Sequence, residues 1–395
     1  MIQTVDTTKC CGCKSCSLVC PQRCIGFTED AIGAVYPVVD RDRCIGCGKC
    51  ETVCPLQGPF RGSIGKAAYA AYSNDSGIRF RGSSGGLFET MALWIIENGG
   101  SVFASKLDED LKLKGYEATT AEGVRELTKS KYLQSDTAQL FPVIQGRLRE
   151  GKQTLFCGTP CQVAALRNYL GEDCRRENLF LVDFFCHGVP SQRFFDKCKE
   201  YVEKRDKIKI IRYEFRAKKE KGATPHYCTI EYEEKGVRKR KTQLYIKDPF
   251  YLGFQKYLTL RDSCYHCPYG KGDHPGDITV GDFHDIDKYV KGIDRFQGVS
   301  TAVINTEKGQ AMWDTIQRRL VVYPMSIQDL YRDKQIYTGG SQEPDGRAAF
   351  VRDMSAMPME AVVHKWLNTG AEWKKAIYYA LPAPIRKAIK RAAGI

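Results

Sequence analysis

Two runs of cysteines near the start of the chain constrain its fold more than any other feature. The first run is Cys10-x-x-Cys13-x-x-Cys16-x-x-x-Cys20 followed by Pro21, and the second is Cys44-x-x-Cys47-x-x-Cys50-x-x-x-Cys54 followed by Pro55. Two-residue gaps let three thiolates converge from one tight loop on a compact soft-metal centre. Two complete runs of this spacing, each ending in Cys-Pro, predict a pair of [4Fe–4S] clusters.

In bacterial ferredoxins with two such clusters, the fourth cysteine of each run binds the cluster of the other run. By that rule the ligands of the first cluster are Cys10, Cys13, Cys16 and Cys54, and those of the second are Cys44, Cys47, Cys50 and Cys20. Gly12, Gly46 and Gly48 let the backbone pass close to the sulfides and point N–H groups at them. Cys11 and Cys24 fall outside the pattern, and we expect them to be buried small hydrophobic residues. The alternative is a pair of zinc sites, because paired cysteines two residues apart also bind zinc.

The distribution of the other cysteines and the charge narrow the class further. Ten of the 18 cysteines lie in the first 54 of the 395 residues. Such crowding in a chain too long for a small disulfide-stapled protein indicates metal ligation in a reducing compartment. The chain starts without the basic and apolar segments of a signal peptide and has no apolar run of membrane-spanning length, so we expect a cytoplasmic protein. The net charge of +13 favours acidic partners, but without a recognised binding module no nucleic acid is expected.

Composition divides the chain into three expected parts. We expect residues 1–62 to form a ferredoxin-like α+β domain for two clusters. Residues 63–345 should form a mixed α/β core with an antiparallel hairpin insertion at 224–244, and residues 346–395 a basic helical tail. Expected strands of the core cover 67–72, 101–107, 152–157 and 178–186, and expected helices cover 87–97, 137–149, about 160–170 and 192–204. The basic tail suits contact with a partner or an anionic membrane surface, or is simply a solvated helix end.

Several short stretches of the core combine glycine, cysteine and polar side chains at expected strand ends. They are Arg81-Gly-Ser-Ser-Gly-Gly86, Lys131-Tyr-Leu-Gln-Ser135, Phe156-Cys-Gly-Thr-Pro-Cys-Gln162, Cys186-His-Gly-Val-Pro-Ser191, Arg261-Asp-Ser-Cys-Tyr-His-Cys-Pro268 and Asp277-Ile-Thr-Val-Gly-Asp282. In this order they resemble the beta-subunit family of coenzyme F420-reducing hydrogenases and F420-linked dehydrogenases, over about residues 67–303. The family commonly carries a fused two-cluster ferredoxin domain. The resemblance implies a flavoprotein with FAD and a further [4Fe–4S] cluster.

The expected flavin site gathers around a glycine–serine loop that enters a helix. Ser83, Ser84, Gly85 and Gly86 offer backbone N–H groups and the positive helix dipole to a phosphate, with charge added by Arg79 and Arg81. From the loop alone, an ordinary N-capped helix with a flexible lead-in is the favoured interpretation. The resemblance makes the loop part of the FAD pocket and adds Lys131, Gln134, Gly158, Thr159, Pro160 and His187. Lys131 would stabilise the reduced flavin anion and His187 would donate a proton, and both are our candidate catalytic residues; a solvated lysine and a hydrogen-bonded turn histidine are the plain alternatives.

The expected third cluster is assembled from distant segments. Its candidate ligands are Cys161, Cys186, Cys264 and Cys267. Only the Cys264–Cys267 pair has the local spacing of a cluster loop, so the grouping rests on the resemblance. Cys161 lies at an expected helix start, which favours a thiolate. Cys157 or His266 in place of one ligand, a zinc site or buried structural thiols are the alternatives.

Together these features predict an iron–sulfur flavoprotein oxidoreductase. Electrons would pass between a redox partner protein or ferredoxin and, through FAD, a small organic substrate such as coenzyme F420 or another two-electron acceptor. The alternative is a relay subunit of a larger redox complex without its own flavin chemistry.

Overall fold

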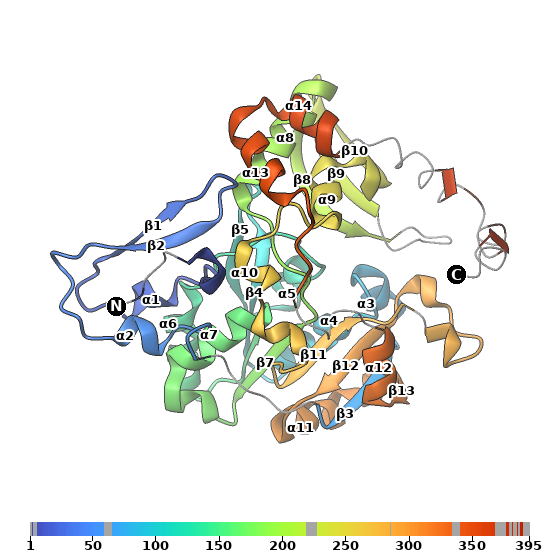
Figure 1. Ribbon diagram of the computed structural model, residues 1–395. Coiled ribbons are helices and arrows are strands. Elements are labelled where there is room, and N and C mark those ends of the chain that lie inside the picture. Colours follow the sequence, from blue (N-terminus) through green and yellow to red (C-terminus); the bar gives the residue numbers. More distant parts are fainter. Residues whose placement is uncertain are drawn as a thin grey trace.

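An eight-stranded mixed sheet forms the centre of the molecule, seen in the computed structural model of Figure 1. The structure describes residues 2, 6–58, 65–218, 227–284, 286–333, 340–367, 377, 378, 381, 385, 388 and 389. The strand order is β13-β3-β12-β11-β7-β6-β4-β5. The bounds are β3 Ala67–Ser73, β4 Ser101–Leu107, β5 Leu113–Ala118, β6 Thr154–Cys157, β7 Leu179–Phe184, β11 Ile278–Asp282, β12 Ser300–Ile304 and β13 Leu320–Met325.

The middle of this sheet is parallel, and that fixes where a site can form. Strands β4, β6, β7 and β11 run parallel to one another. Strand β12 is antiparallel to both β11 and β3, so β3 points in the same direction as the parallel strands. The carboxyl ends of β3, β6, β7 and β11 therefore meet at one edge, which is the edge where open α/β sheets bind ligands.

Helices cover both faces of the sheet because the strands bury side chains alternately. In β4, Val102 and Ala104 pack against α4 and α11, whereas Phe103 packs on the opposite face against α6 and α7. The helices around this sheet are α3 Ser76–Arg81, α4 Leu87–Glu97, α5 Ala121–Leu127, α6 Leu140–Arg149, α7 Pro160–Leu170, α11 Glu307–Ile316 and α12 Ile327–Asp333. Their order, strand then helix, follows the expected α/β alternation.

A second, three-stranded antiparallel sheet carries its own core. Its order is β10-β9-β8, with β8 Lys209–Ala217, β9 Tyr227–Glu234 and β10 Val237–Leu244. The helices against it are α8 Gln192–Asp206, α9 Pro249–Gln255, α13 Arg347–Ala356 and α14 Met359–Val362. An aromatic group fills the core, with Phe195 perpendicular to Phe250 at 5.1 Å between ring centres. The sequence pattern alone did not place β8 beside the hairpin.

The cysteine-rich N-terminal region lies at one side of the molecule (blue in Figure 1). It contains α1 Ser15–Leu18, β1 Ile25–Glu29, β2 Val35–Val39 and α2 Lys49–Thr52. Its β1–β2 hairpin packs Ile32, Ala34 and Tyr36 into the core of the three-stranded sheet. Further along the chain, α10 Asp262–Tyr265 binds this region through a hydrogen bond of 2.7 Å from the Thr7 hydroxyl to Asp262.

Several expected bounds need adjustment. The helix expected from residue 137 begins at Leu140, and the strand expected to residue 186 ends at Phe184, which leaves Cys186 in the turn that follows. The expected boundary at residues 62 and 63 lies outside the described residues, as do the charged residues of the basic tail: Lys374, Lys375, Arg386, Lys387, Lys390 and Arg391. Within the described part of the chain, none of the helices combines the length and apolar character needed to span a bilayer.

Candidate iron–sulfur and flavin site

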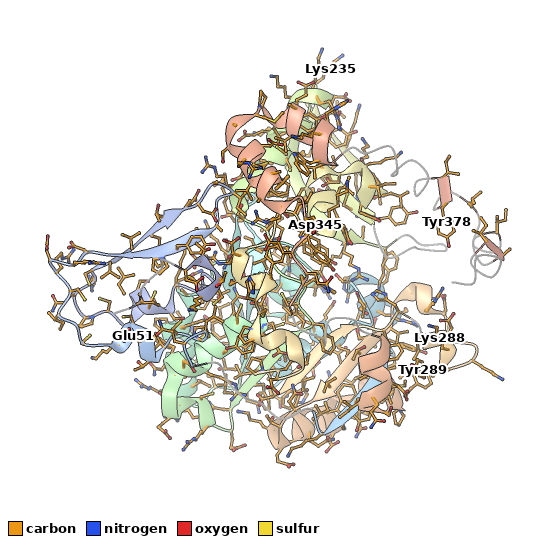
Figure 2. The ribbon with its side chains drawn as sticks, viewed as in Figure 1. Glu51, Lys235, Lys288, Tyr289, Asp345 and Tyr378 are labelled. Atoms are coloured by element: carbon orange, nitrogen blue, oxygen red, sulfur yellow. The ribbon has the colours of Figure 1, made fainter. Side chains whose placement is uncertain are left out.

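The cysteines expected to hold the second cluster line one cavity, which we call the outer site. Cys20, Cys44, Cys47 and Cys50 are all part of its wall, together with Cys24 and the backbone of the loop from Ile45 to Lys49. Gly46 and Gly48 have φ angles of +66° and +72°, a conformation that glycine adopts without strain and that curls this loop around the cavity. Cys47 is exposed. Glu51, in α2 beside Cys50, lies at the outer side of the N-terminal region in Figure 2. The outer site therefore opens to solvent.

The cysteines expected to hold the first cluster form a second group deeper in the molecule, the inner site. Burial raises the pKa of Cys16, and the nearby charges of Cys13, Cys10 and Cys54 raise it further. Cys54, from the second run, is buried. Cys50, from the same run, also acts on Cys16, so the interchange of the fourth ligand stays a prediction.

Cys11 and Cys24 are buried, with 8% and 4% exposure, and they also touch ligand candidates. The sulfur atoms of Cys24 and Cys20 are 3.4 Å apart. The Cys11 thiol is within hydrogen-bonding reach of both Cys13 and Cys161 and lowers the pKa of each. The description of Cys11 as a plain small hydrophobic residue is therefore incomplete, because its thiol joins the inner site to the core.

The four candidates for the third cluster come from three segments and gather in one place, the core site. Cys161 is in the first turn of α7, Cys186 follows β7, and Cys264 and Cys267 lie in and after α10. Burial raises the pKa of Cys186, and the charges of Cys264, Cys161 and Cys267 add to the increase. Burial likewise raises the pKa of Cys267 to about 12, again with Cys161 and Cys264 as neighbours.

The two alternative ligands lie differently. Burial raises the pKa of Cys157 to about 12, and its charged neighbours are Asp183 and Lys131. His266 ends α10 and is exposed. The four sulfur atoms of the core site therefore remain the best ligand set, although their binding of a cluster stays a prediction.

The geometry also bears on the zinc alternative. In the part of the chain that the structure describes, no three His, Cys, Asp or Glu side chains converge tightly enough to hold a single metal ion. In a cubane, each thiolate binds a different iron atom, so the four sulfur atoms stand further apart than the ligands of one ion. Cluster binding by the three quartets stays a prediction.

The expected phosphate loop lies at the carboxyl edge of β3. The Gly85 amide donates to the Ser300 hydroxyl at 2.8 Å, and the Ser83 hydroxyl accepts the Ser130 N–H at 2.7 Å. A side chain at Gly85 would approach the Ala71 carbonyl to 2.4 Å, so only glycine fits there. Gly86, with φ +88°, starts α4 without a side-chain cap, which leaves N–H groups of the first turn for a ligand.

The two arginines expected to add charge at this loop are engaged elsewhere. Arg81 forms an ion pair of 2.6 Å with the buried Glu89. Arg79 donates to the carbonyl of Gly298 at 2.9 Å and stacks on Tyr72. The lysine Lys218 instead reaches the loop and donates to the Ser84 carbonyl at 2.5 Å. That part of the sequence interpretation was wrong, since neighbouring chain position does not decide where a long side chain points.

Lys131 is held between the loop and the end of β6. Its ammonium donates to the carbonyls of Leu127 and Thr128 at 2.7 and 2.6 Å. Burial lowers its pKa to about 7, while the nearby Cys157 charge acts in the opposite direction. Because Ser130 binds Ser83, Lys131 and the glycine–serine loop share one side of the site.

The remaining flavin candidates lie in three places. Gly158, Thr159 and Pro160 link β6 to α7, and the Thr159 amide donates to Gln162 at 3.0 Å. Gln134 instead faces the N-terminal region, where its amide donates to the Cys11 carbonyl at 2.8 Å. His187 is exposed after β7, with its ring nitrogen 3.3 Å from the Tyr257 hydroxyl. Flavin contact by these residues stays a prediction.

One important residue was missed by the sequence interpretation. Arg261 is only 2% exposed and donates to the Cys10 carbonyl and to Gln134. The only available signal was its place at the start of the stretch that carries Cys264 and Cys267.

Two family-model matches define an iron–sulfur protein with a redox electron-transfer role. A family model for a 4Fe-4S binding domain matches residues 36–63, which contain the second cysteine run. A family model for the C-terminal part of the coenzyme F420 hydrogenase/dehydrogenase beta chain matches residues 151–328. Residues 151–328 therefore match the coenzyme F420 hydrogenase/dehydrogenase beta-subunit family, and an iron–sulfur domain precedes them in the chain.

The other comparisons add little. No curated protein matches the chain. Among solved structures, a chain of the F420-reducing [NiFe] hydrogenase complex from Methanosarcina barkeri is similar, at 18% identity and a TM-score of 0.46, over 71% of this chain and 91% of that one. A likeness at this level supports no argument about activity.

Proposed function

We propose that the chain is an oxidoreductase that passes single electrons through three [4Fe–4S] clusters to FAD and from there to a small two-electron substrate. The observation that carries this proposal is the contact of Cys11 with both Cys13 and Cys161, because it sets the inner site directly against the core site. Electrons can then move between groups of sulfur ligands without leaving the protein. Redox catalysis would suit the family whose model matches residues 151–328.

The order of electron transfer would follow from how far each site is exposed to solvent. The outer site opens to solvent at Cys47, so it would exchange electrons with a redox partner protein or ferredoxin. Ile45 beside it has 63% of its surface exposed, which is unusual for a large apolar side chain and suits a protein contact. The inner site is buried and would receive the electron next. The core site, at the carboxyl edge of the sheet, would follow it. The ligands proposed for each cluster are the quartets already named.

At the carboxyl edge, the chain would bind FAD and orient it. The glycine–serine loop and the first turn of α4 would hold phosphate, and Lys131 would offer a cation to the flavin ring. When bound, FAD collects two single electrons and delivers them as a pair. His187 could supply a proton from the turn after β7. We place this chemistry in the cytoplasm, where 18 cysteines remain reduced.

The substrate is a small molecule, and coenzyme F420 is the first one to test. It is anionic, and the net charge of +13 suits it. Anaerobically purified protein should contain about twelve irons per chain, four for each cubane, together with extractable FAD. With a reduced donor it should bleach the absorbance of F420. Full iron and flavin without bleaching would exclude F420 and leave a reductase of another compound.

A relay subunit without its own flavin is the second candidate. It is favoured by one observation, which is that Arg81 and Arg79 turn away from the loop expected to bind phosphate. Flavin extraction separates the two candidates. About twelve irons without FAD, in protein that also fails to bind added FAD, would support the relay.

A further inference from the structure

A buried arginine lies between the inner site and the core site. Arg261 precedes α10, the short helix that carries Cys264, yet its guanidinium reaches into the N-terminal region. Its Nε donates to the Cys10 carbonyl at 2.6 Å, one Nη donates to Gln134 at 3.0 Å, and the other lies 3.6 Å from the Cys10 sulfur. The guanidinium also donates to the Val35 carbonyl and stacks on the Tyr36 ring at 4.3 Å.

The position of this guanidinium is tightly defined. Gly12 has a φ of +68°, and a side chain there would come within 2.7 Å of the guanidinium nitrogen. Gln134 accepts from Arg261 and donates to the Cys11 carbonyl at 2.8 Å, so one amide connects the arginine to the cysteine loop. The shape of the cysteine loop therefore fits the buried guanidinium.

The charge of Arg261 has no carboxylate partner among the residues that the structure describes. Its contacts are carbonyls, an amide, an aromatic ring and a thiol. A buried cation without a counter-charge is strongly destabilising. Cysteine ligands of an iron–sulfur cluster are thiolates, and they would supply the missing negative charge. The nearest one is Cys10, a proposed ligand of the inner site.

Arg261 also contacts the core site. The Cys264 N–H donates to the Arg261 carbonyl at 2.9 Å, and the Arg261 N–H donates to the Val189 carbonyl, in the turn that follows Cys186, at 3.1 Å. Arg261 thus stands within electrostatic reach of both proposed clusters.

We propose that Arg261 is a positioning residue that serves as the shared counter-cation of the inner and core clusters and raises the reduction potentials of both. The inference rests on the proposed function, since it requires a cluster at each site. Reduction adds one negative charge to a cluster, and a nearby cation stabilises that charge, so the potential rises. One cation between two clusters therefore raises both potentials together.

The test compares three variants of the full-length holoprotein, purified anaerobically. Arg261→Met removes the charge, Arg261→Lys keeps it, and Arg79→Met is the matched control. Arg79 is also a buried guanidinium that donates to carbonyls and stacks on a tyrosine, but no cysteine ligand candidate is among its contacts. Iron content and EPR-monitored redox titration of each cluster are the measurements.

In Arg261→Met we expect an iron content near that of wild type. In two clusters the ratio of oxidised to reduced form should rise roughly tenfold at a given potential, so that the reduction potential falls by about 59 mV for one electron. The third, solvent-exposed cluster should keep its potential. Arg261→Lys should retain most of the wild-type potentials, and Arg79→Met all of them.

Full iron with unchanged potentials in Arg261→Met would overturn the proposal, and a shift in only one cluster would overturn the shared role. Loss of iron in both Arg261 variants, with the control intact, would make Arg261 a structural residue only and would also overturn it. A wild-type protein with about eight irons would instead refute the proposed core cluster itself. The failure of the proposed function is thereby distinct from that of the inference.

Discussion

The N-terminal cysteine sites and the core site bring sulfur atoms together by opposite means. In the N-terminal region, three ligands of each quartet come from one short loop, and glycines such as Gly46 and Gly48 bend the backbone around the centre. In the core, Cys161 and Cys186 come from turns after neighbouring parallel strands, and α10 brings the other two ligands. The first arrangement is local, whereas the second exists only when the sheet has formed.

This difference explains how a chain of electron-transfer clusters can arise when a ferredoxin-like domain is fused to a separate core. A loop with local spacing folds around its metal with little help from the rest of the chain, and its surface can face a partner. The core site needs the carboxyl edge of β6 and β7, which is also where an organic cofactor would bind. The Cys11 thiol is the point where the two arrangements meet.

The sharpest test of the local arrangement concerns the interchange of the fourth ligand. Cys50 and Cys54 belong to the same run, but Cys50 lines the cavity of the outer site, and Cys54 is the predicted fourth ligand of the inner site. Each single change to alanine should remove about four irons, and the double variant Cys50→Ala/Cys54→Ala should lose about eight. Iron analysis and EPR of the reduced proteins measure this loss. If each run held its own cluster, the double variant would lose only about four.

The control for this experiment is Cys174→Ala. Cys174 is half-buried, and its neighbours are Arg167 and Lys308 instead of a quartet. It should keep all of its iron. Iron loss in this control would show that any buried cysteine change disturbs the clusters, and the interchange would then have to be judged by EPR alone.

A similar experiment tests the ligands of the core site. Cys186→Ala should leave about eight irons and keep both N-terminal EPR signals, because it removes one ligand of the core site only. Cys157→Ala, in the same part of the fold, should keep about twelve, because the charged neighbours of Cys157 are Asp183 and Lys131. The reverse result, with iron lost from the Cys157 variant and retained in the Cys186 variant, would exchange their assignments.

The N-terminal sites and the core site also differ in how much of each could be predicted from the sequence. The spacing rule names both N-terminal quartets in full, because it is local. The core quartet could be proposed only through family resemblance, since no local pattern joins Cys161 to Cys264. Strand and helix positions around 67–107 were predicted closely, because their apolar patterns are regular. Arg261 and the outward turn of Arg81 were missed, because long side chains choose partners in tertiary space.

The flavin loop extends the comparison to a second site that depends on the fold. In Ser83→Ala, the Ser130 N–H loses its acceptor, and one such bond contributes about 1 kcal/mol. FAD binding should weaken roughly fivefold while the iron content stays that of wild type, as measured by titration of flavin-depleted protein. Ser326→Ala, at the distant start of α12, is the control. Unchanged FAD affinity in the Ser83 variant would place the phosphate elsewhere.

The smallest expected effect concerns the buried lysine near that loop. Burial lowers the pKa of Lys131 from its usual value of 10.5 to about 7 in the folded protein without flavin. Between these two values the unfolded chain holds a proton that the folded chain lacks, so stability contributed by Lys131 rises with pH. The melting temperature of wild type relative to Lys131→Met should therefore increase by roughly 1–3 °C from about pH 7 to about pH 9. Anaerobic calorimetry measures it, with Lys112→Met, an exposed ion-pair lysine, as control. A difference that stays constant or falls over this range would mean that Lys131 keeps its proton in the fold, as a cation held ready for the flavin would.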